Sequence, residues 1–121
     1  MAKKILIIDD EPDIAELIKD CLADKGFEVF SSTSADEGIA VAVKEKPGLI
    51  LLDILLPKID GLECLRLLKQ KIPETLVVVL SGVQNEDVAK EAIRRGAYDY
   101  ITKPFELSQF EEQILNQIFP G

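Results

Sequence analysis

Four short apolar segments of this chain each lead into residues whose side chains can bind a cation or a phosphate group. These residues are Asp9 and Asp10 after residues 5–8, Asp53 after 49–52, Ser81 after 76–80, and, by way of Tyr100, Lys103 after 97–101. Continuous apolar segments of this length, with helix-like stretches between them, are typical of parallel strands buried on both faces. Because parallel strands point the same way, the residues that follow them meet at one edge of the sheet. We therefore expect three carboxylates, a hydroxyl and an ammonium group to gather in one crevice.

Three carboxylates in one crevice need a cation. Two unit negative charges about 4 Å apart repel by roughly 4 kcal/mol at an effective dielectric near 20. A hard divalent ion relieves this repulsion, and ligands that are all oxygen favour Mg²⁺, with Mn²⁺ as an alternative, over zinc. Magnesium leaves positions for phosphate oxygens, while the Lys103 ammonium and the Ser81 hydroxyl can bind further oxygens. This set of groups predicts phosphoryl transfer, in which a carboxylate can act as nucleophile and form an acyl phosphate.

Each of these residues also has an ordinary structural explanation. Asp10 could cap the helix expected from Pro12, and this alternative to a role in the site stays open. Ser81 alone would be a loop hydroxyl, and Lys103 alone would be a solvated surface lysine. Asp53 is the hardest to explain in this way, because a carboxylate at the end of an apolar strand needs a partner. The joint placement of all of them at strand ends favours a functional site.

The elements that must position these residues form five strand–helix units. We expect strands at 4–8, 27–31, 49–53, 76–80 and 97–101, and helices at 12–24, 34–45, 60–71, from Asn85 to Gly96, and at 106–118. This alternation predicts an α/β fold with a five-stranded parallel sheet, order 2-1-3-4-5, doubly wound by five helices. Such sheets bind ligands where the strand order reverses, which here lies between the first and third strands. Those are the strands that Asp9 and Asp53 follow.

Composition limits the class of protein. The 121 residues suit one domain, 1–121, and the net charge of −8 argues against electrostatic binding to nucleic acid or to an anionic membrane. No apolar stretch approaches the roughly 18 residues of a membrane-spanning helix, and no signal peptide opens the chain, so we expect a cytoplasmic protein. The chain has no histidine. Its cysteines fit helical apolar stripes, Cys21 with Ile14, Leu17 and Ile18, and Cys64 with its neighbours, which argues against zinc or redox sites.

Four motifs of the chain follow one another in order. They are residues 6–11 with Asp9, Asp10 and Glu11, residues 51–57 followed by Asp60-Gly61, Ser81, and residues 99–105 with Lys103. In these motifs the chain resembles the receiver domain of two-component response regulators, over essentially its whole length and with the flavodoxin-like fold of chemotaxis regulators. The resemblance implies that Asp53 accepts a phosphoryl group from a sensor histidine kinase or a phosphotransfer protein. It also implies that Asp10, Asp53 and the backbone carbonyl of Leu55 bind Mg²⁺, and that Asp9 supports the ion mainly through water. Lys103 would pair with Asp53 before transfer and with the phosphoryl group afterwards.

The resemblance further implies how phosphorylation changes the binding of a partner. The phosphoryl oxygen would draw in the Ser81 hydroxyl, and the ring of Tyr100 would enter the space that this frees. The surface of the fourth helix, fifth strand and fifth helix, with Lys90 and Arg94, would then bind a downstream effector domain or protein, or a second copy of the chain. The domain would catalyse its own phosphorylation and dephosphorylation, and it would not be an enzyme in the usual sense. No direct contact with nucleic acid or membrane is expected.

Two other functions remain as alternatives. A magnesium-dependent phosphatase of the haloacid dehalogenase type also uses an aspartate nucleophile on a parallel sheet, but it expects Asp-x-Asp where Asp9, Asp10 and Glu11 are contiguous. A flavodoxin-type module needs a hydroxyl-rich phosphate loop where this chain has carboxylates. Whether the domain stands alone or belongs to a longer regulator stays open.

Overall fold

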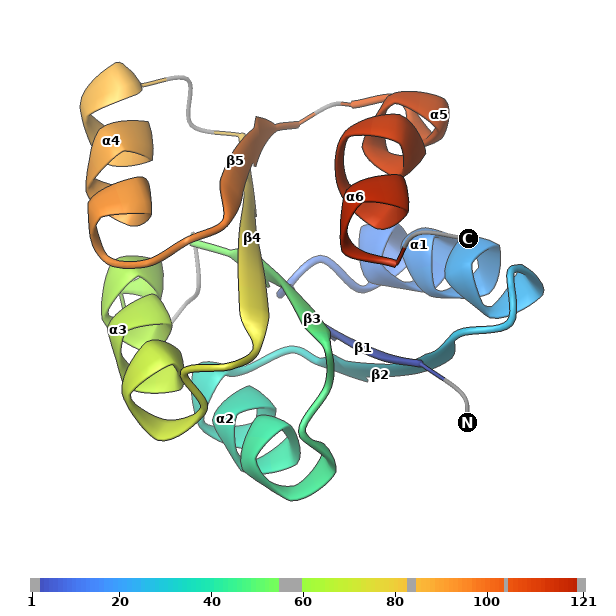
Figure 1. The fold of residues 1–121 in the computed structure, drawn as a ribbon, viewed down its shortest axis with the longest axis horizontal. Helices are drawn as coiled ribbons and strands as arrows, with labels where there is room; N and C mark the ends of the chain where they lie inside the picture. The colour runs from blue at the N-terminus through green and yellow to red at the C-terminus, as the bar shows by residue number, and fades with distance from the viewer. Residues whose placement is uncertain (1–2, 55–59, 83–84, 104, 120–121) are drawn as a thin grey trace.

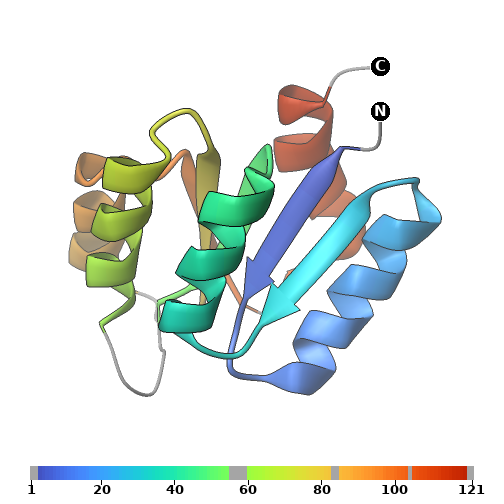
Figure 2. The same cartoon turned by 90° about the horizontal axis from the view of Figure 1, so that it is seen from below.

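The structure is a computed structural model that describes residues 3–54, 60–82, 85–103 and 105–119. Its centre is a five-stranded parallel sheet with the order β2-β1-β3-β4-β5, as expected (Figure 1). The strands are β1 (Lys4–Ile8), β2 (Glu28–Ser32), β3 (Leu49–Asp53), β4 (Leu76–Ser81) and β5 (Asp99–Thr102). Figure 2 shows β1 and β2 side by side, with β2 at the edge of the sheet. The predicted α/β fold class is confirmed.

Helices cover both faces of the sheet. They are α1 (Pro12–Asp24), α2 (Ala35–Glu45), α3 (Gly61–Lys71), α4 (Glu86–Arg94) and a last segment made of α5 (Leu107–Phe110), η1 (Glu111–Leu115) and α6 (Asn116–Ile118). α1 and the last segment pack on one face, and α2, α3 and α4 pack on the other (Figure 1). None of the helices in the described ranges is long and apolar enough to span a membrane. The last segment has the predicted extent, but η1 in its middle is a π-helix.

The three central strands are apolar on both faces because both faces are covered. Side chains of a strand alternate between the two faces. In β1, Ile5 and Ile7 therefore pack against α1, whereas Leu6 and Ile8 join the cluster under α2 and α3. β3 and β4 follow the same rule, and their apolar side chains, apart from Leu76 at the start of β4, are almost completely buried. These strands hold the residues that follow them at fixed heights along one edge.

Polar side chains cap three of the helices, which begin where the sequence predicts. The side-chain oxygens of Ser34, Asp60 and Asn85 each accept a hydrogen bond from a backbone N–H group in the first turn of the helix that follows. The N-terminus of α1 is different, because its N-cap residue is Glu11 and no side chain caps it. The alternative role of Asp10 as a helix cap is therefore not realised.

Two expectations about the elements are wrong in detail. The apolar stripe of α1 that includes Leu17 is not buried across its whole width, because Leu17 is 63% exposed. The fifth strand was expected from residue 97, but β5 begins at Asp99, since the Ala97 N–H group still donates to the Ala92 carbonyl and closes the turn after α4. The expectation for the cysteines is confirmed: Cys64 is buried and Cys21 is half-buried.

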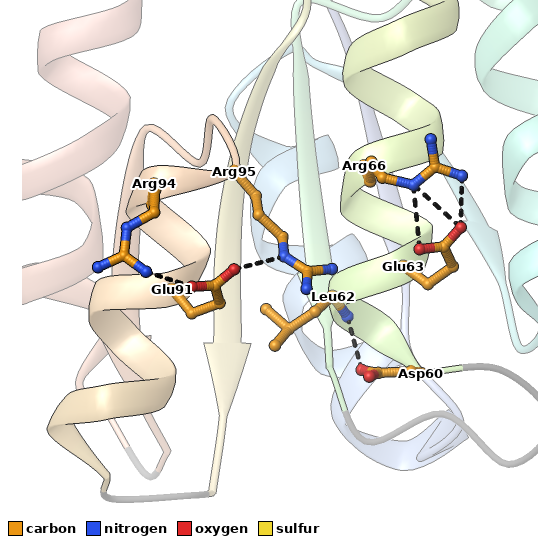
Figure 3. A network of polar contacts seen from close by, with 7 residues as sticks. All are labelled: Asp60, Leu62, Glu63, Arg66, Glu91, Arg94 and Arg95. Atoms are coloured by element: carbon orange, nitrogen blue, oxygen red, sulfur yellow. Dashed lines mark hydrogen bonds and ion pairs between the residues drawn. The ribbon is translucent and has the colours of Figure 1, made fainter.

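α4 is held by few apolar contacts and by charges. Ala92 is its one buried residue in the described part of the chain. Near its C-terminal end Glu91 accepts hydrogen bonds from Arg94 and Arg95, and Arg95 extends toward α3 (Figure 3). On α3, the Arg66 guanidinium holds the pKa of Glu63 below its usual value, and the charge of Arg95 acts in the same direction. The α3–α4 contact is therefore partly electrostatic.

Candidate functional site

The register of the sheet brings the predicted site residues to one edge. Ile8 at the end of β1 pairs with Leu52 in β3, so Asp9 and Asp53 both come next after paired residues. Asp53 pairs with Leu80 in β4, and Ser81 pairs with Thr102 in β5, directly before Lys103. The carboxyl ends of four strands therefore present Asp9, Asp53, Ser81 and Lys103 at neighbouring positions, at the point where the strand order reverses.

Four carboxylates form a cluster at this edge. Oxygen atoms of Asp9, Asp10, Glu11 and Asp53, one from each residue, all lie within 4.8 Å of one another. Asp9 and Asp53 are buried, whereas Asp10 and Glu11 are exposed. The Asp9 side chain also accepts a hydrogen bond of 2.9 Å from the Glu11 N–H group, which fixes the start of α1 beside the cluster. We call these four residues the carboxylate cluster.

Glu11 is the member of the cluster for which the sequence predicts no role. Its signal in the sequence is its position directly after Asp9 and Asp10. That signal is weak, because residues at the start of a helix are commonly acidic for reasons of the helix dipole alone. Only the three-dimensional placement shows that its side chain turns back toward the other carboxylates.

Lys103 provides the positive charge of the site. Its Nζ donates to Asp9 Oδ2 at 2.7 Å and to Asp53 Oδ2 at 3.2 Å, and it lies 3.5 Å from Glu11 Oε1. Burial, with 11% of the side chain exposed, would lower the pKa of Lys103, but the carboxylates of Asp9 and Asp53 outweigh this effect and raise it. The lysine is therefore a permanent cation. The contact with Asp53 that the resemblance implies is present, and the contact with Asp9 is shorter.

Ser81 and Tyr100 lie on the same face of the sheet. Ser81 is fully buried, and its backbone carbonyl accepts a hydrogen bond of 2.7 Å from the Lys103 N–H group. Tyr100 is half-buried against the cluster under α2, α3 and α4, and it pairs with Val79, two residues before Ser81. Both side chains therefore point toward the α4 side. Leu55, the other predicted site residue, lies outside the described residues.

A cavity of about 450 Å³ opens beside the carboxylate cluster. Glu11, Asp53 and Lys103 contribute its charged lining, and residues of α1, including Leu17, form its apolar wall together with Phe105 and Leu107. The exposed Leu17 is part of this wall. A molecule in the cavity contacts both the Asp53 carboxylate and this apolar wall.

The chemistry of the cluster fits a hard divalent cation. All four ligand groups offer carboxylate oxygen, the donor type that Mg²⁺ and Mn²⁺ prefer. Four carboxylates against the one ammonium of Lys103 leave an excess of three negative charges. A bound divalent cation would neutralise most of this excess and would still leave room for a phosphoryl group.

Fold and site together define an open, doubly wound α/β protein with a cluster of carboxylates at its switch point. The family model described as "Response regulator receiver domain" matches residues 5–115. The chain therefore belongs to the response regulator receiver family, which consists of signalling domains of two-component systems. The comparisons do not support the phosphatase alternative of the haloacid dehalogenase type.

Known relatives agree with this assignment. The nitrogen assimilation regulatory protein NtrX of Azorhizobium caulinodans is 47% identical over 107 residues, which are 87% of this chain and 24% of that protein. The solved receiver domain of NtrX from Brucella abortus is 40% identical, with a TM-score of 0.87 over 94% of this chain and 96% of that one. A response regulator protein of Burkholderia pseudomallei, solved with a phosphorylated aspartic acid, a calcium ion and citrate, is 29% identical, with a TM-score of 0.85 over 89% of this chain and 64% of that one. This chain thus spans about a quarter of the length of the Azorhizobium relative.

Proposed function

We propose that this domain accepts a phosphoryl group on Asp53 from a phosphohistidine of a sensor kinase or a phosphotransfer protein. The observation that carries the proposal is the buried Asp53 carboxylate in contact with Lys103 inside the carboxylate cluster. Asp10 and Asp53 would hold Mg²⁺, together with the carbonyl of Leu55, and Asp9 would support it through water. The bound ion would supply positive charge for the phosphoryl oxygens. The divalent ion and phosphorylated aspartate of the Burkholderia relative support this assignment.

The proposed reaction uses Asp53 as the nucleophile. A carboxylate oxygen attacks phosphorus, the P–N bond of the phosphohistidine breaks, and its electron pair returns to the ring nitrogen. Lys103 stays charged throughout, since its pKa is raised, and it passes from the Asp53 carboxylate to a phosphoryl oxygen. The signal ends when water attacks phosphorus and the bond between phosphorus and the Asp53 oxygen breaks. This step restores the Asp53 carboxylate and releases inorganic phosphate.

The proposed output uses Ser81 and Tyr100. Both lie on the α4 side of the sheet, so a Ser81 hydroxyl drawn to the phosphoryl group leaves space on the side where the Tyr100 ring lies. α4 has one buried residue in the described part of the chain, so a shift of this helix disrupts little apolar packing. Phosphorylation would favour the shifted arrangement by binding it more tightly. The surface of α4, β5 and the last helical segment would then recognise an effector domain or protein, or a second copy of the domain 1–121.

The acceptor assignment is tested by phosphate uptake. Incubation with Mg²⁺ and a small phosphodonor should give one acid-labile phosphate per wild-type chain and none in Asp53→Asn. The matched control is Asp20→Asn, which removes an exposed carboxylate of α1 outside the carboxylate cluster and should be labelled normally. Labelling of Asp53→Asn to the wild-type level, or an unlabelled wild type at saturating Mg²⁺, would contradict the proposal.

The switch assignment is tested with Tyr100→Ala. We expect this variant to bind BeF₃⁻, a phosphoryl mimic, as the wild type does, but to lose the changes in amide chemical shifts of α4 and to bind its partner more weakly. Tyr100→Phe keeps the ring and is the control. If BeF₃⁻ changes the amide chemical shifts of α4 in Tyr100→Ala as it does in the wild type, and partner affinity is also that of the wild type, Tyr100 is not part of the switch.

A further inference from the structure

Glu11 lies at the edge of the site and is held there by its backbone. Its N–H group donates to Asp9 Oδ1 at 2.9 Å, and its carbonyl accepts from the Ala15 N–H group in the first turn of α1. Pro12 follows it and restricts its backbone to extended conformations, in agreement with the observed φ of −97° and ψ of 95°. The Glu11 side chain therefore starts from a fixed point beside the carboxylate cluster.

The carboxylate of Glu11 is exposed to solvent and also lies close to Lys103. The side chain is 55% exposed, yet it reaches to 3.5 Å from Lys103 Nζ. It lines the same cavity as Asp53 and Lys103. A phosphodonor in this cavity therefore meets the negative charge of Glu11 directly beside the lysine.

We propose that Glu11 determines which phosphodonors this domain accepts: it slows small anionic donors and favours donors with positive charge beside the phosphoryl group. This inference rests on the proposed phosphorylation of Asp53. A freely diffusing phosphate ester or anhydride brings only negative charge to the Glu11 carboxylate. A donor protein can place a cationic group beside its phosphoryl group and pair it with Glu11. Because Glu11 also belongs to the carboxylate cluster, its charge strengthens the binding of the divalent cation.

Two small donors of different charge test this inference. Acetyl phosphate is dianionic, whereas phosphoramidate carries a protonated nitrogen and has one negative charge fewer. In both reactions an Asp53 oxygen attacks phosphorus, and the electron pair of the broken P–O or P–N bond leaves with acetate or with ammonia. For one exposed charge near the path, Coulomb's law with salt screening predicts that Glu11→Gln reacts about fivefold faster with acetyl phosphate and about twofold faster with phosphoramidate at saturating Mg²⁺. The ratio of the two rates should therefore rise.

Cation binding gives a readout that does not depend on phosphorylation. Calorimetric titration with Mg²⁺, or titration with Mn²⁺ followed by electron paramagnetic resonance, should show weaker binding to Glu11→Gln than to the wild type. Glu11→Asp keeps the charge and should keep the donor ratio of the wild type. Glu16→Gln is the matched control, because it makes the same charge change at an exposed position of α1 outside the cluster and the cavity.

The outcomes separate this inference from the proposed function. A higher donor ratio and weaker cation binding in Glu11→Gln, with Glu16→Gln unchanged, support the inference. Equal changes in both variants would show an effect of net charge alone and overturn it, as would a donor ratio in Glu11→Gln equal to that of the wild type. A wild type that takes phosphate from neither donor would overturn the proposed function and this inference with it.

Discussion

Replacement of Asp10 by asparagine should stabilise the metal-free protein. The substitution removes one negative charge from the carboxylate cluster and keeps the size of the side chain. Asp10 is exposed, and no hydrogen bond or ion pair joins its side chain to another of the described residues. The change therefore relieves repulsion and removes no favourable contact of this kind.

The spacing of the cluster gives the size of the effect. The Asp10 oxygen lies within 4.8 Å of oxygens of Asp9, Glu11 and Asp53. At a dielectric of about 80, which suits an exposed group, each pair at this separation repels by about 0.9 kcal/mol. Three repulsions, offset by roughly one attraction of similar size to Lys103, leave about 2 kcal/mol before salt screening. We expect the free energy of unfolding of Asp10→Asn to exceed that of the wild type by about 1–2 kcal/mol at low salt.

Urea unfolding followed by circular dichroism measures this difference. The first experiment uses EDTA and low ionic strength, with Asp20→Asn as the control because it changes the net charge equally at an exposed site of α1. A surface change of that kind should stay within about 0.5 kcal/mol of the wild type. In a second experiment with Mg²⁺, the wild type should gain stability by mass action, and Asp10→Asn should gain much less.

Two results would refute this reasoning. If Asp10→Asn is no more stable than Asp20→Asn in EDTA, the carboxylates do not repel one another as their spacing implies. If Mg²⁺ stabilises Asp10→Asn as much as the wild type, Asp10 does not bind the ion.

Three further predictions concern the structure around the site. Gly61→Ala should lower the free energy of unfolding in urea by about 1–3 kcal/mol or more, because a Cβ atom would lie 2.1 Å from the Ile54 Cα atom, where backbone cannot move aside. Asn85→Ala should lower the free energy of unfolding by about 1 kcal/mol because the helix cap is lost, and the rise in amide hydrogen exchange should be largest in α4. Burial raises the pKa of the Cys64 thiol to about 12 from a usual value of 9.0, so a thiol reagent at pH 8 should label Cys21 well before Cys64. Below pH 9 the Cys64 thiol is neutral in both the folded and the unfolded state, and its contribution to the free energy of unfolding is fully present. Alkaline unfolding should show this contribution being lost as the pH rises toward 12.

Each of these predictions has a control and a contrary result. Gly82→Ala should be tolerated, since a Cβ atom there meets nothing within 4 Å, and equal losses at both glycines would contradict the argument from Gly61. Asn85→Asp keeps the cap, so the rates of amide hydrogen exchange in α4 should match those of the wild type. Rapid labelling of Cys64 in the folded protein, checked against Cys64→Ala, would show that the thiol is not buried as described.

The sequence predicted the bounds of an element best where a single local change in residue type marks them. The bounds of β1 and β3 matched because apolar residues change directly to aspartate at Asp9 and Asp53. The start of β5 was missed because the Ala97 N–H group is used by the turn after α4, a competition that composition does not reveal. Leu17 was missed because helical periodicity gives a stripe but not its width, and the packing of the last helical segment leaves this side chain beside the cavity.

The site was predictable as a set of residues but not as a set of contacts. Strand ends in a parallel sheet must meet, so the gathering of Asp9, Asp53 and Lys103 followed from topology. Which carboxylate lies closer to Lys103 depends on side-chain rotamers, and the contact of 2.7 Å to Asp9 could not be foreseen. Glu11 was overlooked for the same reason, because its role in the cluster depends on a side chain that turns back over the start of α1.

The Lys103–Asp9 contact joins two residues that are 94 positions apart in the chain. During synthesis on the ribosome, Asp9 emerges early, but its lysine partner leaves the exit tunnel only after nearly the whole sheet is available to fold. Contacts between such distant positions form late and slowly in folding. A nascent or misfolded copy thus holds its aspartates without the lysine, so the Lys103–Asp9 contact reports that the domain has been synthesised as far as Lys103 and has folded.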